Sequence, residues 1–391
     1  MRILLYTGKG GTGKSVISCA TGVLTSSLGH ETLVISSDPS HTLRDIFEAS
    51  IREKPTRILS RLWALQVDPI KEVKEKYEVI YEYAASVFKA RGLDETLAYE
   101  VASLPNMTPF IALLKLVDLV EEGGFDVIIL DTVPSGEALK NLYLPSLLGS
   151  ISRKLLRAGS YLLGVTKVIE PLIGAPTPSK EVILTDLKLI DKLEALKNYL
   201  TDDSITSLRL IANPDSFSIE NMRRTYITSN LYNINVDLAI VNKVVPDEVS
   251  DPYFDQWKLN QKLYLDEAER AFYPLPVKRL KLFKSELKGL SKLEEAGNEM
   301  FKGEDPSKVY FKGKPIQIVK TDEGLKLIVK TPFLTSKELH EVERIGDELV
   351  VKVDTDVGEV RSFIPLPAIA YSMHLSTAKL LNGELHIYLS K

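Results

Sequence analysis

The chain has 391 residues, a net charge of −4 at pH 7 and one cysteine. It is too long for one ordinary domain, and 44% hydrophobic and 26% charged residues give it a globular composition. The weak negative charge argues against nucleic-acid binding, and one cysteine excludes an internal disulfide or a multi-cysteine metal site within a chain. Because a strand pattern begins at once, we expect no signal peptide and a cytoplasmic location.

An apolar strand pattern at Ile3–Tyr6 leads into a glycine-rich loop and then into a helix pattern. Residues 8–15 match Gly-x-x-x-x-Gly-Lys-Ser/Thr, the pattern of loops whose backbone N–H groups surround a phosphate. In such a loop Lys14 would neutralise the β- and γ-phosphates, and Ser15 would bind Mg²⁺. The predicted nucleotide contacts are Gly8, Gly10, Gly11, Thr12, Gly13, Lys14, Ser15 and Val16.

Lys9 adds a second lysine that a plain phosphate loop does not need. The pattern Lys-Gly-Gly-x-Gly-Lys-Ser/Thr is typical of ATPases that bind nucleotide between the subunits of a dimer. In those proteins the first lysine reaches the partner's phosphates and adds positive charge where the transition state develops negative charge. The sequence therefore predicts ATP and Mg²⁺ as cofactors, Lys9 and Lys14 as catalytic residues, and a homodimer across the nucleotide.

Four more strand patterns alternate with helix patterns, at Thr32–Ser36, Val127–Leu130, Ser207–Ile211 and Leu238–Val241. Short apolar runs that end in polar loops are typical of buried parallel strands, whose ligands bind beyond their carboxyl ends. Long helical insertions are expected at about 45–124 and 136–204. This alternation predicts an α/β fold over residues 1–302, with a parallel β-sheet flanked by helices.

Two aspartates follow these strand patterns. Asp38 lies where a carboxylate can orient or deprotonate a water that attacks the γ-phosphate. Asp131 ends the Val127 strand, the usual place for a carboxylate that holds Mg²⁺, often through water. We therefore expect Asp38 to be catalytic and expect the metal to be held by Ser15, Asp38 and Asp131.

The residue that follows the last of these strands bears on the identity of the base. Guanine-binding proteins often have Asn-Lys-x-Asp at this place, whereas in the run that starts at Asn242 the fourth residue is Val245. The missing carboxylate favours adenine. Asn242 then either pairs with the adenine edge or only caps the end of the strand.

Apolar stripes mark the helical insertions. Large apolar residues fall near one helical face between Leu144 and Leu172, interrupted by too many charges for a membrane span. This stripe is either core packing or the lining of an apolar groove for a client protein. A second stripe runs from Val73 to Phe88, and Phe110–Val120 is expected to form a core helix.

The pattern changes after a polar stretch near residues 302–307. Apolar and polar residues then alternate at 316–319, 325–329, 348–353 and 385–389. This alternation predicts a second domain, a β-sandwich over residues 308–391.

Three motifs together closely resemble the arsenite-pump and tail-anchored-protein-targeting ATPases, over roughly residues 1–300. They are Gly8–Ser15, Asp38-Pro-Ser-His41 with Asp45, and Asp131-Thr-Val-Pro-Ser-Gly136. The resemblance implies a P-loop NTPase fold with an inserted helical subdomain, and a homodimer that ATP closes and hydrolysis opens. It also places Asn242 and the stretch 281–289, with Phe283, beside the adenine. In the targeting branch the paired helical subdomains shield a client's transmembrane helix.

The end of the chain resembles an α-crystallin domain of small heat-shock proteins. Ala378-Lys-Leu-Leu-Asn-Gly-Glu-Leu-His-Ile-Tyr-Leu carries this resemblance, with Asn382-Gly383 as a tight hairpin turn. Such a domain either stabilises the protein or binds clients and partners, and fold analogy does not decide between these roles.

Departures from the family pattern distinguish its branches. Metalloid-activated members use several cysteine thiolates, whereas Cys19 stands alone and is expected to be a small buried residue. The Cys-x-x-Cys that holds zinc in some targeting members is also missing, and Glu137 stands where histidine is expected. The leading hypothesis is a dimeric ATPase that targets hydrophobic, tail-anchor-like segments, with a membrane receptor as a further candidate partner. The alternatives are the ATPase subunit of an arsenite pump and a partitioning-type ATPase.

Overall fold

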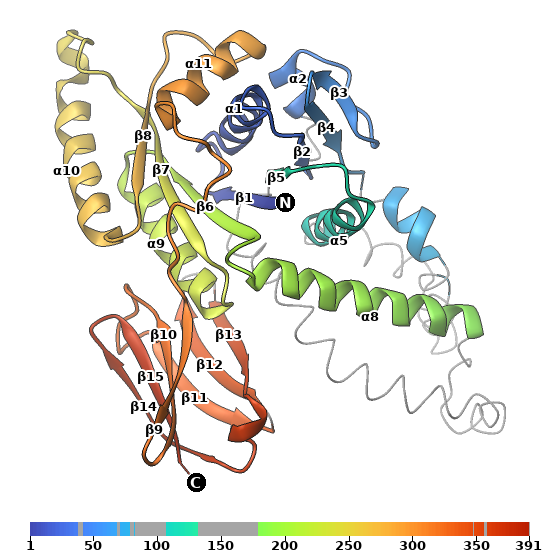
Figure 1. Cartoon of the computed structure of the whole chain (residues 1–391). Coiled ribbons are helices and arrows are strands. Elements are labelled where there is room, and N and C mark those ends of the chain that lie inside the picture. Colours follow the sequence, from blue (N-terminus) through green and yellow to red (C-terminus); the bar gives the residue numbers. More distant parts are fainter. Residues whose placement is uncertain are drawn as a thin grey trace, which may run out of the picture.

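The computed structural model describes residues 1–37, 42–68, 71–78, 82, 107–131, 179–346, 348–355 and 358–390. Figure 1 shows a larger α/β part that carries the N-terminus and a smaller β part that carries the C-terminus. The predictions for Asp38, for Glu137 and for the stripe from Leu144 to Leu172 lie outside the described residues.

The α/β part is built on an eight-stranded sheet in the order β3-β4-β2-β5-β1-β6-β7-β8. Every neighbouring pair is parallel except β3 with β4, which is antiparallel. The strands are β1 (Arg2–Gly8), β2 (Thr32–Ser36), β3 (Thr56–Leu59), β4 (Leu62–Gln66), β5 (Val127–Asp131), β6 (Thr206–Ala212), β7 (Val236–Val244) and β8 (Val277–Lys281). The predicted α/β fold and its five strands are confirmed.

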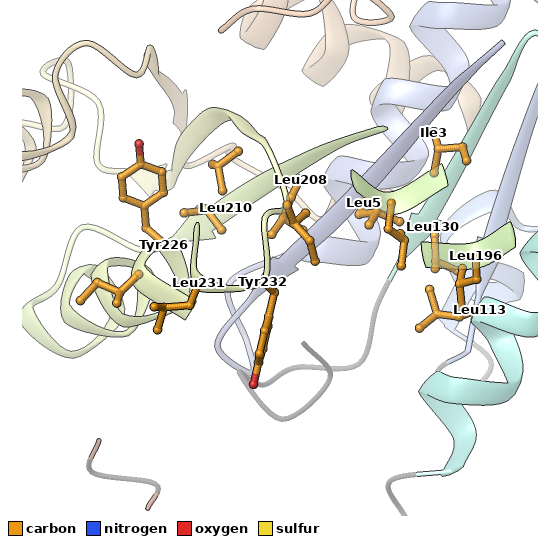
Figure 2. Packing of buried hydrophobic residues seen from close by; sticks show 14 of the residues in the cluster. Ile3, Leu5, Leu113, Leu130, Leu196, Leu208, Leu210, Tyr226, Leu231 and Tyr232 are labelled. Atoms are coloured by element: carbon orange, nitrogen blue, oxygen red, sulfur yellow. The ribbon is translucent and has the colours of Figure 1, made fainter. Parts of the chain in front are cut away.

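Helices cover both faces of this sheet because successive strand residues point to opposite sides. On one face Leu4 and Tyr6 pack against α1 (Lys14–Ser27), α2 (Thr42–Phe47) and α11 (Leu290–Phe301). On the other face Ile3 and Leu5 face α5 (Met107–Glu122), α8 (Lys180–Thr201), α9 (Ser216–Leu231) and α10 (Asp255–Phe272). Figure 2 shows Leu113 of α5 and Leu196 of α8 beside Leu130 of the sheet.

Two strands lie where the sequence predicted only helix. Strands β3 and β4 fall inside the range 45–124, and β4 extends the main sheet by pairing with β2. That range is therefore not wholly helical, and its described helices are α2, α5 and one at 71–78. A five-residue run such as Leu62–Gln66 is too short for its periodicity to separate strand from helix.

The C-terminal part is a β-sandwich, as predicted. One sheet has the order β14-β15-β10-β9 and the other has the order β11-β12-β13. The strands are β9 (Ile316–Thr321), β10 (Gly324–Lys330), β11 (Leu339–Ile345), β12 (Glu348–Thr355), β13 (Gly358–Pro365), β14 (His374–Leu381) and β15 (Glu384–Ser390). Asn382 and Gly383 have φ of 49° and 77°, so both adopt the left-handed conformation of the predicted hairpin turn.

The two parts share one apolar core. Phe333, in the loop after β10, contacts the rings of Tyr226 on α9 and Phe272 on α10, with centroid distances of 6.1 and 5.2 Å. The hydroxyl of Ser362 on β13 donates to the carbonyl of Leu231, the last residue of α9, over 2.6 Å. The sandwich therefore packs directly on α9 and α10.

None of the helices within the described ranges is both long and apolar enough to cross a membrane.

Candidate functional site

The glycine-rich loop connects β1 to α1 at the carboxyl edge of the sheet. Gly8 ends β1 so close to β6 that a Cβ there would lie 2.1 Å from the carbonyl oxygen of Ile211. Gly13 caps α1 with φ of 90°, a conformation that side chains rarely adopt. Within the loop, the buried Thr12 donates its hydroxyl to the carbonyl of Lys9 over 2.8 Å. The predicted strand–loop–helix arrangement is confirmed.

Lys14 and Ser15 stand at the positive end of the α1 dipole. The Lys14 side chain is buried, and its Nζ donates to the carbonyl of Lys9 over 3.3 Å, so its charge stays over the loop. The first turn of α1 contains no acidic residue that would offset this positive field. N–H groups of a first helical turn have no partner within the helix, and they are ready donors to a phosphate.

Asp131 ends β5, the strand beside β1, at the same edge of the sheet as the loop. In the sheet register it stands opposite Tyr6 of β1 and Ser36 of β2, and the Ser36 hydroxyl donates to its carboxylate over 3.5 Å. The Asp131 side chain is buried, and β2 ends there, directly before the residues that lead to Asp38. The structure therefore places Asp131 at the sheet edge where the loop begins, whereas Asp38 lies outside the described residues.

The donor set fits Mg²⁺. Ser15 supplies a hydroxyl oxygen and Asp131 a carboxylate, the hard oxygen ligands that Mg²⁺ prefers alongside substrate phosphates and water. Within the described ranges, no group of three or more His, Cys, Asp or Glu side chains could hold a metal ion on its own. A site that depends on phosphate oxygens for most of its ligands needs no such protein cluster.

Two predicted base contacts lie beyond the loop. Asn242, at the end of β7, donates its amide Nδ2 to the carbonyl of Thr12 over 2.8 Å. Phe283 follows β8, and its partly buried ring packs against the core on the α1 face, with Lys281 Nζ 5.5 Å from its centroid. The N–H of Gly289, at the end of this stretch, donates to the carbonyl of Ile46 over 2.9 Å. Asn242 is thus hydrogen-bonded to the phosphate loop, and the stretch that contains Phe283 is hydrogen-bonded to α2.

The two loop lysines have different surroundings. Lys9 is exposed, and its Nζ lies 5.4 Å from the ring centroid of Phe217 at the start of α9. Phe217 itself is 76% exposed, and sequence analysis did not identify it because a single phenylalanine after the Asp215 cap gives no pattern. Lys14 therefore contacts its own loop, whereas the Lys9 amine lies beside the start of α9.

Cys19 lies in α1 below the loop and is fully buried. Burial raises the pKa of its thiol well above the usual range, and the nearby Asp131 carboxylate adds to this effect. A thiol kept neutral is a poor ligand for soft metals and metalloids, because the thiolate is the binding form. The predicted role as a small buried residue agrees with this position.

Sequence comparison assigns this arrangement to a known family. The family described as anion-transporting ATPase matches residues 1–302. The chain belongs to this family. A second family, described as an HSP20-like domain found in ArsA, matches residues 322–389. The chain is therefore an ATPase with a nucleotide site and an HSP20-like domain, as the resemblances in its sequence predicted.

Relatives within the family carry two kinds of name. A Prosthecochloris vibrioformis protein named as an arsenical pump-driving ATPase is 34% identical over 99% of this chain and 95% of its own length. An Aquifex aeolicus protein named as arsenical pump-driving ATPase 1 is 31% identical over the full length of both. The ATPase GET3 of Podospora anserina is 26% identical over 77% of this chain and 91% of its own length. These names leave the biological task of the ATP hydrolysis open.

Proposed function

We propose that this ATPase works as a Mg²⁺-dependent homodimer that captures and releases hydrophobic protein segments, such as tail anchors. The proposed dimer rests on one observation, that the side chains of the two loop lysines point in different directions. Lys14 is buried over its own loop, while Lys9 is exposed and directed away from it. A lysine in that position can reach phosphates on a facing subunit.

Each residue of the site then has a role at the phosphates. Lys14 and the N–H groups of the loop bind the β- and γ-phosphates, and Asp38 positions the attacking water. When bound, Mg²⁺ neutralises phosphate charge, and Ser15 and Asp131 are the residues that would hold it. Lys9 of the facing subunit stabilises the charge that develops on the transferred phosphoryl group. Asn242 and Phe283 hold the adenine.

Cysteine content favours a hydrophobic client over a metalloid. A site for arsenite needs several thiolates, whereas the chain has one cysteine, buried and with a raised pKa. The HSP20-like domain fits a role in shielding apolar segments. We place the cycle in the cytoplasm, where ATP is available, and keep a membrane receptor as a candidate partner.

A capture experiment tests this function. The full-length protein is mixed with a fluorescent peptide that contains one apolar transmembrane helix, with ATP or with ADP, and the complex is measured by size-exclusion chromatography. We expect capture with ATP and release with ADP. Leu155→Asp combined with Leu162→Asp should abolish capture and leave the basal ATPase rate unchanged. The control is Leu184→Asp, which adds a charge at an exposed position of α8.

One outcome would move the groove to another part of the protein, and a second would contradict the proposed client. If the double variant captures the helix as well as the parent protein does, the apolar stripe between Leu144 and Leu172 is not the groove that binds the client. A several-fold stimulation of the parent ATPase rate by arsenite, lost in Cys19→Ser, would instead favour the arsenite-pump ATPase, the function that the names of two relatives give.

A further inference from the structure

Two neighbouring side chains join the end of β7 to the phosphate loop. The amide of Asn242 donates to the carbonyl of Thr12 over 2.8 Å, and Nζ of Lys243 donates to the carbonyl of Gly11 over 2.7 Å. The loop and the strand end are 230 residues apart in the sequence. Because the two carbonyls belong to consecutive loop residues, both contacts restrain the same short piece of backbone.

The backbone at Lys243 is shaped to make this contact. Lys243 has φ of 60°, in the left-handed region that non-glycine residues rarely occupy. Its N–H donates to Oδ1 of Asn242 over 2.9 Å, which fixes the orientation of that amide. A residue held in this conformation persists only where surrounding contacts over-determine it. Here those contacts direct both side chains to the loop.

Gly13 is matched to the same contact. A Cβ at Gly13 would lie 2.4 Å from Nδ2 of Asn242, so only glycine lets the amide approach. The Thr12 carbonyl and the Gly13 N–H belong to one planar peptide group and point in opposite directions. A bond that draws the carbonyl toward β7 therefore turns the Gly13 N–H toward the other side of the loop, where a phosphate is expected.

We propose that Asn242 and Lys243 are positioning residues that hold the phosphate loop in its binding conformation before nucleotide arrives. The inference rests on the proposed nucleotide roles of the loop. A loop that is already ordered loses less conformational entropy when it binds, so its affinity is higher. Asn242 still has one amide hydrogen and one Oδ1 lone pair to offer an adenine edge. Lys243 acts only on the phosphate side.

Lys243→Met tests this role, with Lys243→Arg as the conservative variant. The control is Lys262→Met, which removes one charge from an exposed position on α10. Binding of ATP, GTP and inorganic pyrophosphate is measured by calorimetry, together with steady-state ATP hydrolysis.

We expect Lys243→Met to bind ATP and pyrophosphate about tenfold more weakly, the scale of one exposed, charge-assisted hydrogen bond. KM should rise by the same factor and kcat should stay within about twofold. The ATP-to-GTP preference should not change, and arginine should restore most of the affinity.

The outcomes separate this inference from the proposed function. Equal pyrophosphate affinity of the parent and Lys243→Met would overturn the positioning role, and so would an altered ATP-to-GTP preference. Failure of the parent protein to bind ATP would instead overturn the nucleotide roles of the loop. The unfolding midpoint without nucleotide should match the parent, because the contact orders a loop and not the core. If Lys243→Met does not fold, Lys243→Gln takes its place in the same measurements.

Discussion

At the scale of single residues, the phosphate loop combines a fixed lysine with a displaceable one. Lys14 is buried and held by a carbonyl of its own loop. Lys9 rests on the exposed ring of Phe217, and exposed cation–π contacts are worth only about 0.5–1 kcal/mol. Phosphates on a facing subunit would therefore draw Lys9 away from Phe217 at little cost. The contact of Lys9 with Phe217 is therefore compatible with a role of Lys9 at the nucleotide of a facing subunit.

Mixing two inactive chains tests the action of Lys9 in trans. Asp38→Asn should lose most ATP turnover, since a group that positions or deprotonates water typically contributes about 10²–10⁴-fold. Lys9→Ala should also lose most of it, since one donor to the developing charge is typically worth about 10²–10³-fold. Their mixture should recover part of the activity, because one site of the heterodimer combines an intact Lys9 with an intact Asp38. The measurement is the ATPase rate as a function of the mixing ratio. Full activity of Lys9→Ala alone, or no recovery on mixing, would contradict the role.

At the scale of secondary structure, burial decided which elements the sequence could predict. Strands β1, β2, β5, β6 and β7 are buried on both faces, so each is a short apolar run. Strand β8 was not predicted, because on this edge strand only Leu280 is fully covered and charged residues surround it. Strands β3 and β4 were not predicted, because their short runs lie among helical patterns.

In the candidate site, the sequence predicts the local motif but not the contacts between distant residues. The loop with Lys9, Lys14 and Ser15 is a local motif, and a motif can be recognised without knowledge of the fold. The contact of Lys243 with Gly11 joins residues 232 apart and follows no local pattern, so the sequence does not reveal it. Contacts that arise only when strands pair require the structure.

A fully buried ion pair joins Arg209 on β6 to Asp237 on β7. Both side chains are fully buried, with 3.1 Å between Nε and Oδ1, and Arg209 also donates to the Tyr6 hydroxyl and to the Pro306 carbonyl. Burial is the largest single influence and would lower the pKa of Arg209, but the Asp237 carboxylate and the Tyr6 hydroxyl together outweigh burial and raise it. Arg209 thus joins the sheet to the stretch between α11 and β9.

Asp237→Asn should destabilise the protein strongly. The substitution keeps the shape of the side chain but leaves the Arg209 charge buried without a counter-charge, which typically costs about 3–5 kcal/mol. Urea unfolding measures the loss. Glu269→Gln is the control, since it breaks an exposed pair with Arg279 and should cost less than about 1 kcal/mol. Equal unfolding midpoints for the two variants would show that the buried pair contributes no more than a surface pair.

At the scale of the whole molecule, α9 connects the nucleotide site to the HSP20-like domain. Its first turn carries Phe217 beside Lys9, and the carbonyl of its last residue, Leu231, accepts the hydroxyl of Ser362 in the sandwich. Domains within a chain move relative to one another unless their interface is large and apolar. Here the aromatic contacts of Phe333 with Tyr226 and Phe272 make one apolar core of both parts, so the two domains should move and unfold together.

Phe333→Asp tests whether the two parts form one cooperative unit. The substitution removes two aromatic contacts, each worth about 0.5–1.5 kcal/mol beyond the area that it buries, and the cation–π contact with Arg223. It also places a charge against Tyr226 and Phe272. Calorimetry should then show two unfolding transitions where the parent shows one, and limited proteolysis should cut between α11 and β9. Ile369→Asp, at a position 60% exposed on the sandwich, is the control and should keep the single transition. A single, unshifted transition in Phe333→Asp would mean that the remaining contacts between the sandwich and α9, such as the Ser362 hydrogen bond, suffice to hold the domains together.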